Sequence, residues 1–231
     1  MERTILLSVG PGGVAADLAE PAIPRLLTKE DIRRHFVARV PGPARGGGLH
    51  LLRGDHDLNP GMAPAAALRA AAVLVPLVDR SRDLSVLLTQ RTANLEHHAG
   101  QIAFPGGRVE ETDADDIATA LRETEEEIGL SRNHVEPVGR LDRYITRTGF
   151  TVTPVVGLVE PPFKLTLAPD EVADAFEVPL SFILDPANRQ RDSYEFQGVE
   201  RHFYVFRFGE RNIWGATAGM LVNLAETLTG R

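Results

Sequence analysis

The chain has 231 residues, of which 43% are hydrophobic and 25% charged, with a formal net charge of −7 and no cysteine. This composition is typical of a globular protein and excludes a disordered chain, a collagen and a disulfide-rich scaffold. Without cysteine, thiolate metal sites and cysteine nucleophiles are excluded too. The apolar runs at 70–78 and 5–9 are too short for a membrane span or a secretory leader. We therefore expect a cytoplasmic protein with one active core.

Residues 1–67 differ from the rest of the chain because they are rich in glycine and proline, which favour turns and linkers. Within them, Thr28 precedes two acidic residues in the pattern of a helix N-cap, and Ile32 and Phe36 follow at helical spacing. The sequence predicts an N-terminal extension over 1–67 that contains one amphipathic helix, near 28–40.

The segment 68–231 is predicted to form the main domain. Valine, leucine, isoleucine and aromatic residues bordered by glycine, proline or aspartate predict strands at 71–78, 84–89, 101–104, 137–144, 151–159, 194–197 and 203–208. Helices are predicted at 115–128, 179–185 and 217–228. Strands before and after a central helix, with a helix at the end, predict the α/β class with a mixed β-sheet sandwiched between helices.

The acidic residues are concentrated in one segment. Residues 110–127 carry nine acidic side chains and one arginine, a net charge of −8, so the remainder of the chain is nearly neutral at +1. Nucleic-acid binding normally needs a basic surface. This distribution therefore argues against a nucleic-acid partner and favours binding of divalent cations.

Three carboxylates of this segment share one face of the predicted helix 115–128. At 100° per residue, Glu123, Glu126 and Glu127 fall within a 100° arc, whereas Ile117 and Ile128 lie on a separate apolar face. Like charges at this spacing destabilise a helix, and Mg²⁺ or Mn²⁺ bound through oxygen would compensate them. Taken alone, the pattern is more often a solvated charged face.

The surrounding residues make the segment recognisable. From Gly107 to Leu130 it resembles the Nudix box, G-x5-E-x7-R-E-U-x-E-E-x-G-U, in which U is a bulky aliphatic residue, and the R-E-x-x-E-E half is intact from Arg122 onward. There are departures: Asp113 replaces a glutamate and is separated from Arg122 by eight residues rather than seven, and Thr124 replaces an aliphatic residue. The resemblance implies a Nudix fold and a metal-dependent diphosphatase.

A second resemblance indicates a subfamily within this family. Residues 87–107 are similar to the L-L-T-x-R-S-x-x-L…H-x-G-x-I-x-F-P-G-G signature of the coenzyme A pyrophosphatases among Nudix hydrolases, and residues 212–218 also resemble that subfamily. The likeness covers about 68–229. It implies hydrolysis of coenzyme A or acyl-coenzyme A to 3′,5′-ADP and an (acyl-)4′-phosphopantetheine product. The implied partner is a small molecule, with no nucleic acid or membrane, and a homodimer is left open.

The resemblance also implies roles for the acidic helix. Glu123, Glu126 and Glu127 would hold Mg²⁺ or Mn²⁺, and Arg122 would orient a carboxylate by a charge-assisted hydrogen bond. Glu123 is the first choice for the general base. Glu171, in a downstream loop, is the alternative.

The substrate-binding residues are expected upstream of this helix. Gly106 and Gly107 permit close approach of the backbone, and Arg91 is the cation expected to contact the 3′-phosphate. The pantetheine arm needs an uncharged groove, for which the candidates are Leu95, Ile102 and Phe104.

Other assignments stay open. A rival enzyme would be a Nudix hydrolase of ADP-ribose, NADH or nucleoside triphosphates, and a different class would be a Nudix module that binds without turnover. The intact acids of the helix argue against the binding module. Tyr144 and Trp214 are candidates either for stacking on adenine or for the core, and Asp55-His56-Asp57 is interpreted as a solvated turn.

Overall fold

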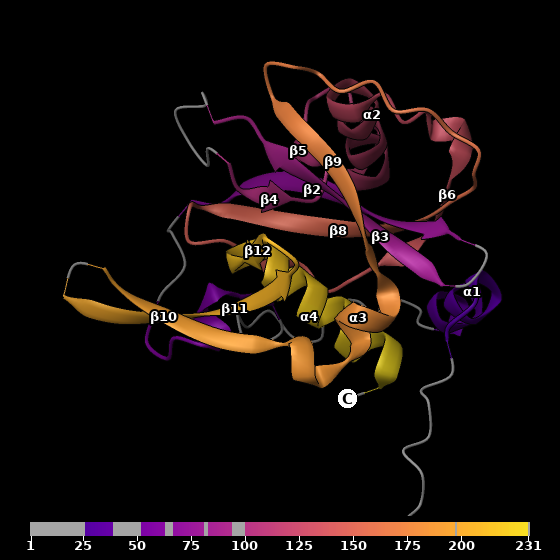
Figure 1. Ribbon diagram of the computed structural model, residues 1–231. Coiled ribbons are helices and arrows are strands. Elements are labelled where there is room, and N and C mark those ends of the chain that lie inside the picture. Colours follow the sequence, from indigo (N-terminus) through magenta and orange to yellow (C-terminus); the bar gives the residue numbers. More distant parts are fainter. Residues whose placement is uncertain are drawn as a thin grey trace, which may run out of the picture.

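Helices cover both faces of a large mixed sheet. Helix α2 (Asp116–Ile128) lies on one face, and helices α3 (Leu180–Leu184) and α4 (Gly215–Thr229) lie on the other (Figure 1). The predicted α/β class, with a mixed sheet between helices, is confirmed. None of the described helices is long and apolar enough to cross a membrane. The computed structural model describes residues 26–38, 52–62, 67–80, 83–93, 100–196 and 198–230.

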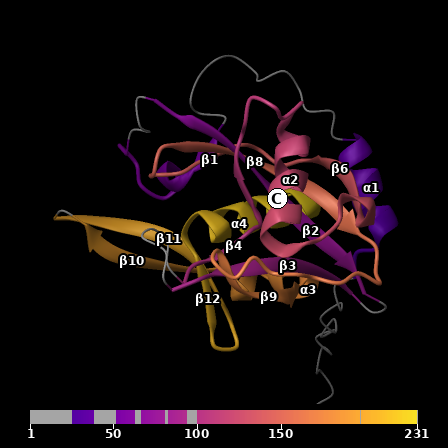
Figure 2. The same cartoon turned by 90° about the horizontal axis from the view of Figure 1, so that it is seen from above.

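The described strands form two sheets. Those of the large sheet are β1 (Arg53–Gly54), β2 (Arg69–Asp79), β3 (Leu84–Arg91), β4 (Ile102–Ala103), β5 (Gly106–Arg108), β6 (Val135–Arg140), β7 (Tyr144–Ile145), β8 (Phe150–Val159) and β9 (Val172–Pro179). The small sheet contains β10 (Gln190–Phe196), β11 (Val199–Phe208) and β12 (Arg211–Trp214). The β10–β11 hairpin projects from the body of the molecule in both views (Figures 1 and 2).

The order in the large sheet is β1-β7-β8-β2-β3-β4, with β5 also paired to β2, β6 to β8 and β9 to β3. The central β2 and β8 run parallel, and both are almost continuously apolar and buried because helices cover both faces. Pro76 has no N–H to donate. It falls between the stretches of β2 that pair with β5, at 71–73, and with β3, at 77–79.

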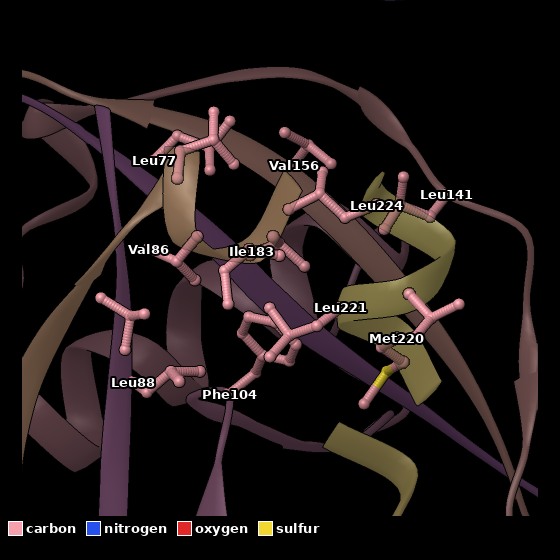
Figure 3. Packing of buried hydrophobic residues seen from close by; sticks show 14 of the residues in the cluster. Leu77, Val86, Leu88, Phe104, Leu141, Val156, Ile183, Met220, Leu221 and Leu224 are labelled. Carbon is pink, nitrogen blue, oxygen red and sulfur yellow. The ribbon is translucent and has the colours of Figure 1, made fainter. Parts of the chain in front are cut away.

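The core on the α4 side of the sheet is the larger of two apolar clusters. Leu88 and Val86 of β3 pack there with Leu221 of α4 (Figure 3). Ile102 and Phe104 are 7% and 3% exposed in the same cluster, so they support the core and do not line a groove for the pantetheine arm. Leu95, the third residue expected in that groove, lies outside the described residues.

Helix α1 (Lys29–Ala38) lies within the range expected for the N-terminal helix and packs on β6. Ile32 and Phe36 are buried. The Phe36 ring occupies the space that a side chain at Gly139 of β6 would need. On its outer side, Arg33 pairs with Glu136 at 2.7 Å. This helix is therefore part of the folded body.

The segment around Asp55 is also part of the fold, contrary to its interpretation as a solvated turn. It forms a 3-10 helix, Asp55–Asp57, and the Asp55 carboxylate accepts hydrogen bonds of 2.8 Å from the Tyr144 hydroxyl and from the Arg147 backbone N–H. Tyr144 is 5% exposed, so its ring is a core residue and does not offer a surface for adenine. Trp214 is 39% exposed and packs edge-on against Phe203.

Candidate active site

The ends of helix α2 are fixed by local signals. Asp115 caps the N-terminus by accepting a hydrogen bond from the Ala118 N–H at 2.8 Å. At the C-terminus Gly129 adopts the left-handed conformation, with φ 68°, and donates to the Glu125 carbonyl. Thr124 and Ile128 are fully buried against the sheet. The predicted separation of an apolar face from an acidic face is therefore present.

Two glycines bring strand β5 close to the acids of this helix. Gly106 has φ 150°, and a Cβ there would overlap the backbone of Val73 on β2. A Cβ on Gly107 would lie 2.5 Å from the carboxylate oxygens of Glu123. At Gly106 only glycine allows the close approach to β2, and at Gly107 a side chain would displace the Glu123 carboxylate.

Arg122 is held by several acceptors at once. Its Nε and Nη2 each donate to a different oxygen of Asp113 at 2.9 Å, and Nη1 donates to Glu123 at 3.0 Å and Glu126 at 3.1 Å. Nη2 also donates to the Arg108 carbonyl at 3.1 Å. These bonds join the helix to the loop that follows β5. They hold the carboxylates of Glu123 and Glu126 at one nitrogen of the guanidinium group, with Asp113 at its other edge.

Asp113 completes this clamp despite its departures from the family motif. Its side chain is 4% exposed and also accepts from the Thr119 hydroxyl at 2.8 Å and the Glu110 N–H at 2.9 Å. The Arg122 guanidinium, followed by the Glu110 N–H, holds the pKa of Asp113 well below its usual range. The loop before α2 therefore accommodates both departures: the extra residue between Asp113 and Arg122, and an aspartate where the motif has the longer glutamate.

Glu127 is the buried acid of the site, with only 5% of its surface exposed. One carboxylate oxygen accepts from the Gly106 N–H at 3.1 Å, and the other lies 3.8 Å from Nη1 of Arg91. Burial raises the pKa of Glu127 to about 7, and the nearby charges of Glu171 and Glu123 add to this. Burial also raises the pKa of Glu123.

Arg91 and Glu171 approach the helix from neighbouring segments. The Arg91 N–H donates to the Gln101 carbonyl at 2.9 Å, at the end of β3. The next residue, Thr92, bonds to the loop before β9: its N–H donates to the Glu171 carbonyl at 3.0 Å. The structure thus brings together the sequence-predicted residues Arg91, Glu123 and Glu127, with Glu171 close enough for its charge to act on both acids.

The acids do not converge on a single point. Among the described residues, no three acidic or histidine side chains are close enough together to coordinate one ion. Glu123 and Glu126 face Arg122, and Glu127 faces Gly106 and Arg91. The donors are all carboxylate oxygens, which is the chemistry that Mg²⁺ and Mn²⁺ prefer. The chemistry of these donors therefore fits a hard divalent cation, and a cation at Glu127 would lie beside Arg91.

A family model for the NUDIX domain matches residues 68–206. The chain belongs to the Nudix family. Nudix hydrolase NudL of Citrobacter koseri, whose description calls it uncharacterized, is 43% identical over 157 residues, covering 68% of this chain and 81% of that protein. NudL of Escherichia coli K12, with the same description, is 41% identical with the same coverage.

Among solved structures, a MutT/nudix family protein from Enterococcus faecalis has a TM-score of 0.43 and 15% identity, and the match covers 90% of this chain and 82% of that one. Family membership makes this Nudix protein a pyrophosphohydrolase that acts on a diphosphate-containing substrate. Nudix enzymes generally use divalent metal ions, in accord with the oxygen donors on helix α2.

Proposed function

We propose that this Nudix hydrolase cleaves the diphosphate bond of coenzyme A or acyl-coenzyme A, releasing 3′,5′-ADP and an (acyl-)4′-phosphopantetheine product. The observation that carries the proposed chemistry is the buried carboxylate of Glu127, which lies between a glycine N–H and an arginine. A carboxylate removed from water in this way costs stability, and a bound cation would offset that cost.

Glu123, Glu126 and Glu127 would hold Mg²⁺ or Mn²⁺. When bound, the cation would neutralise charge on the diphosphate oxygens and lower the pKa of an attacking water. Arg122 positions two of these acids through the bonds that also fix Asp113. Its role is orientation, because its donors are engaged by Asp113, Glu123, Glu126 and the Arg108 carbonyl.

Glu123 is our choice for the general base that takes the proton from water. It lies next to Gly107, and burial raises its pKa, which favours proton uptake by its carboxylate. Glu171 is the alternative general base. It is exposed, and its backbone carbonyl accepts a hydrogen bond from the Thr92 N–H. Single Gln variants at these two positions separate the assignments by the pH profile of kcat.

The coenzyme A assignment is supported by how the chain assembles its two signature segments. The Thr217 hydroxyl at the start of α4 donates to the Ile102 carbonyl of β4 at 2.9 Å, in the core. Residues from both segments therefore meet in the core on the α4 side of the sheet, and the first segment continues to Gly106, which donates to Glu127. Arg91 lies against Glu127, and from this position we assign its cation to the diphosphate rather than to the more distant 3′-phosphate.

The experiment is a comparison of kcat/KM for coenzyme A, dephospho-coenzyme A and ADP-ribose with Mg²⁺ and with Mn²⁺, with products identified by mass. With Arg91 assigned to the diphosphate, a preference for the 3′-phosphate requires a second cation of the protein at that group, and a charge-assisted contact of this kind is worth roughly 10–150-fold in kcat/KM. We expect coenzyme A to be preferred over dephospho-coenzyme A by about that factor and over ADP-ribose by more. If ADP-ribose equals or exceeds coenzyme A, the substrate assignment fails while the Nudix chemistry stands.

One alternative is a hydrolase of ADP-ribose, NADH or nucleoside triphosphates, and the same comparison of kcat/KM extended to those compounds would reveal it. The other alternative is a module that binds without turnover. The binding module would show affinity for the diphosphate but release no product. The homodimer and the cytoplasmic location stay predictions from the sequence.

A further inference from the structure

The contact between Arg91 and Glu127 is incomplete on both sides. The closest approach, Nη1 to Oε1, is 3.8 Å, too long for a hydrogen bond, although Glu127 is buried. Nε of Arg91 is buried as well and has no acceptor among the described residues. An arginine in this state neutralises the acid by charge alone and keeps an unused donor inside the protein.

This geometry conflicts with a cation at the same acid. A divalent ion bound to Glu127 would lie within a few ångströms of the Arg91 guanidinium, and the two positive charges would repel each other. Glu123 and Glu171 lessen the repulsion without removing it. In the absence of substrate, Arg91 should therefore weaken metal binding.

A substrate diphosphate resolves the conflict. Its oxygens would accept hydrogen bonds from Arg91, including its Nε, and their negative charge would lie between the guanidinium and the metal. Arg91 would exchange a long contact with Glu127 for short bonds to the substrate, leaving Glu127 to the cation.

We propose that Arg91 is an exchangeable counter-ion of Glu127 that opposes metal binding in the free enzyme and favours substrate binding once the metal is present. This inference rests on the function proposed above. Its consequence is reciprocal: the diphosphate strengthens metal binding, and the metal strengthens diphosphate binding. Arg91 is then a residue with opposite effects on the two ligands, which a purely structural arginine would not have.

The test measures Mn²⁺ affinity without substrate, by isothermal titration or electron paramagnetic resonance, and KM for coenzyme A at saturating Mn²⁺. The variant is Arg91→Gln. The matched control is Arg132→Gln, which removes the same charge from a surface pair with Glu125 outside the site. We expect Arg91→Gln to bind Mn²⁺ about 10-fold more tightly and to have a KM raised about 10-fold or more, with both values unchanged in Arg132→Gln.

Arg91→Lys provides the second variant, because it keeps the charge and loses the Nε donor. We expect a Mn²⁺ affinity close to that of the wild type and a KM between those of the wild type and Arg91→Gln. Weaker Mn²⁺ binding in Arg91→Gln, or no change in either quantity, overturns the inference. Measuring Glu127→Gln alongside keeps the two proposals apart: if it binds Mn²⁺ as the wild type does, the proposed metal site itself is wrong.

Discussion

Two arginines neutralise acids of the same helix in different ways. Arg122 makes bonds of 2.9–3.1 Å to three carboxylates and one carbonyl. Arg91 approaches a single buried carboxylate at 3.8 Å, and its Nε is without an acceptor among the described residues. The first arrangement is satisfied and holds the loop on the helix. The second leaves the Nε of Arg91 unsatisfied within the described part of the chain, which is the condition expected of a group that awaits a ligand.

The difference shows that a charged cluster can combine support and chemistry. Removing a partner from the satisfied clamp leaves buried acids unpaired and should destabilise the fold. Removing the under-satisfied acid relieves strain and should affect only function.

The largest effect is expected from Glu127→Gln. The substitution keeps the size of the side chain and removes a metal-binding charge, so kcat should fall at least ~10²-fold. The melting temperature should not fall, because a buried charge and its repulsion with Glu123 are removed. Steady-state kinetics and thermal unfolding measure both quantities. The control is Glu125→Gln on the same helix, because the Glu125 carboxylate pairs with Arg132. Full activity in Glu127→Gln would refute the assignment of Glu127 as a metal ligand.

The same acid should make the stability of the metal-free protein depend on pH. Its pKa is raised in the folded state from 4.5 to about 7, so folding favours the protonated form. Protonation therefore stabilises the fold at low pH, and this stabilisation, at most about 3 kcal/mol, is lost as the pH rises through 7. Denaturant unfolding in EDTA at pH 5 and pH 8 should show the loss in the wild type. A similar loss in Glu127→Gln would show that another group is responsible.

Arg122→Met should reduce both stability and activity. Asp113 loses the partner that lowers its pKa, and Glu123 and Glu126 lose their orientation. Loss of a group that orients metal ligands typically costs 10–100-fold in activity, and we expect a loss in that range. The melting temperature should fall as well, in contrast to Glu127→Gln. A variant with wild-type melting temperature would show that the clamp does not support the fold.

The smallest effect is expected at the exposed pair of Arg33 and Glu136, which links helix α1 to β6. Both side chains are more than a third exposed, so Arg33→Gln should leave the melting temperature almost unchanged. Activity should be unchanged. A larger destabilisation would mean that the exposure of an arginine pair does not determine how much the pair contributes to the stability of this protein.

Local signals made the acidic helix predictable from the sequence. The cap at Asp115, the glycine at 129 and the apolar spacing all lie within the helix or beside it. The acids of the site follow from that helix and its motif. By contrast, β5 contains two glycines and was not predicted as a strand, because its extended conformation comes from pairing with β2.

Long-range partners account for most of the remaining differences. Strand β9 carries Asp174 and Glu177, which interrupt its apolar pattern, and it forms by pairing with β3 more than 80 residues away. Asp55 is bonded to Tyr144 and Arg147, 89 and 92 residues along the chain. The approach of Arg91 to Glu127 depends on the same kind of assembly. A single sequence contains no local signal for such contacts.

The central claim is that the acidic face around Glu127 binds the catalytic cation, and ligand-induced stabilisation tests it most directly. A cation at 100 times its Kd stabilises the folded protein by about 2.7 kcal/mol, which raises the melting temperature of a chain of this size by several degrees. We predict that Mn²⁺ raises the melting temperature of the wild type by about this amount and that of Glu127→Gln by clearly less. An equal rise in both proteins would place the cation elsewhere and contradict the account.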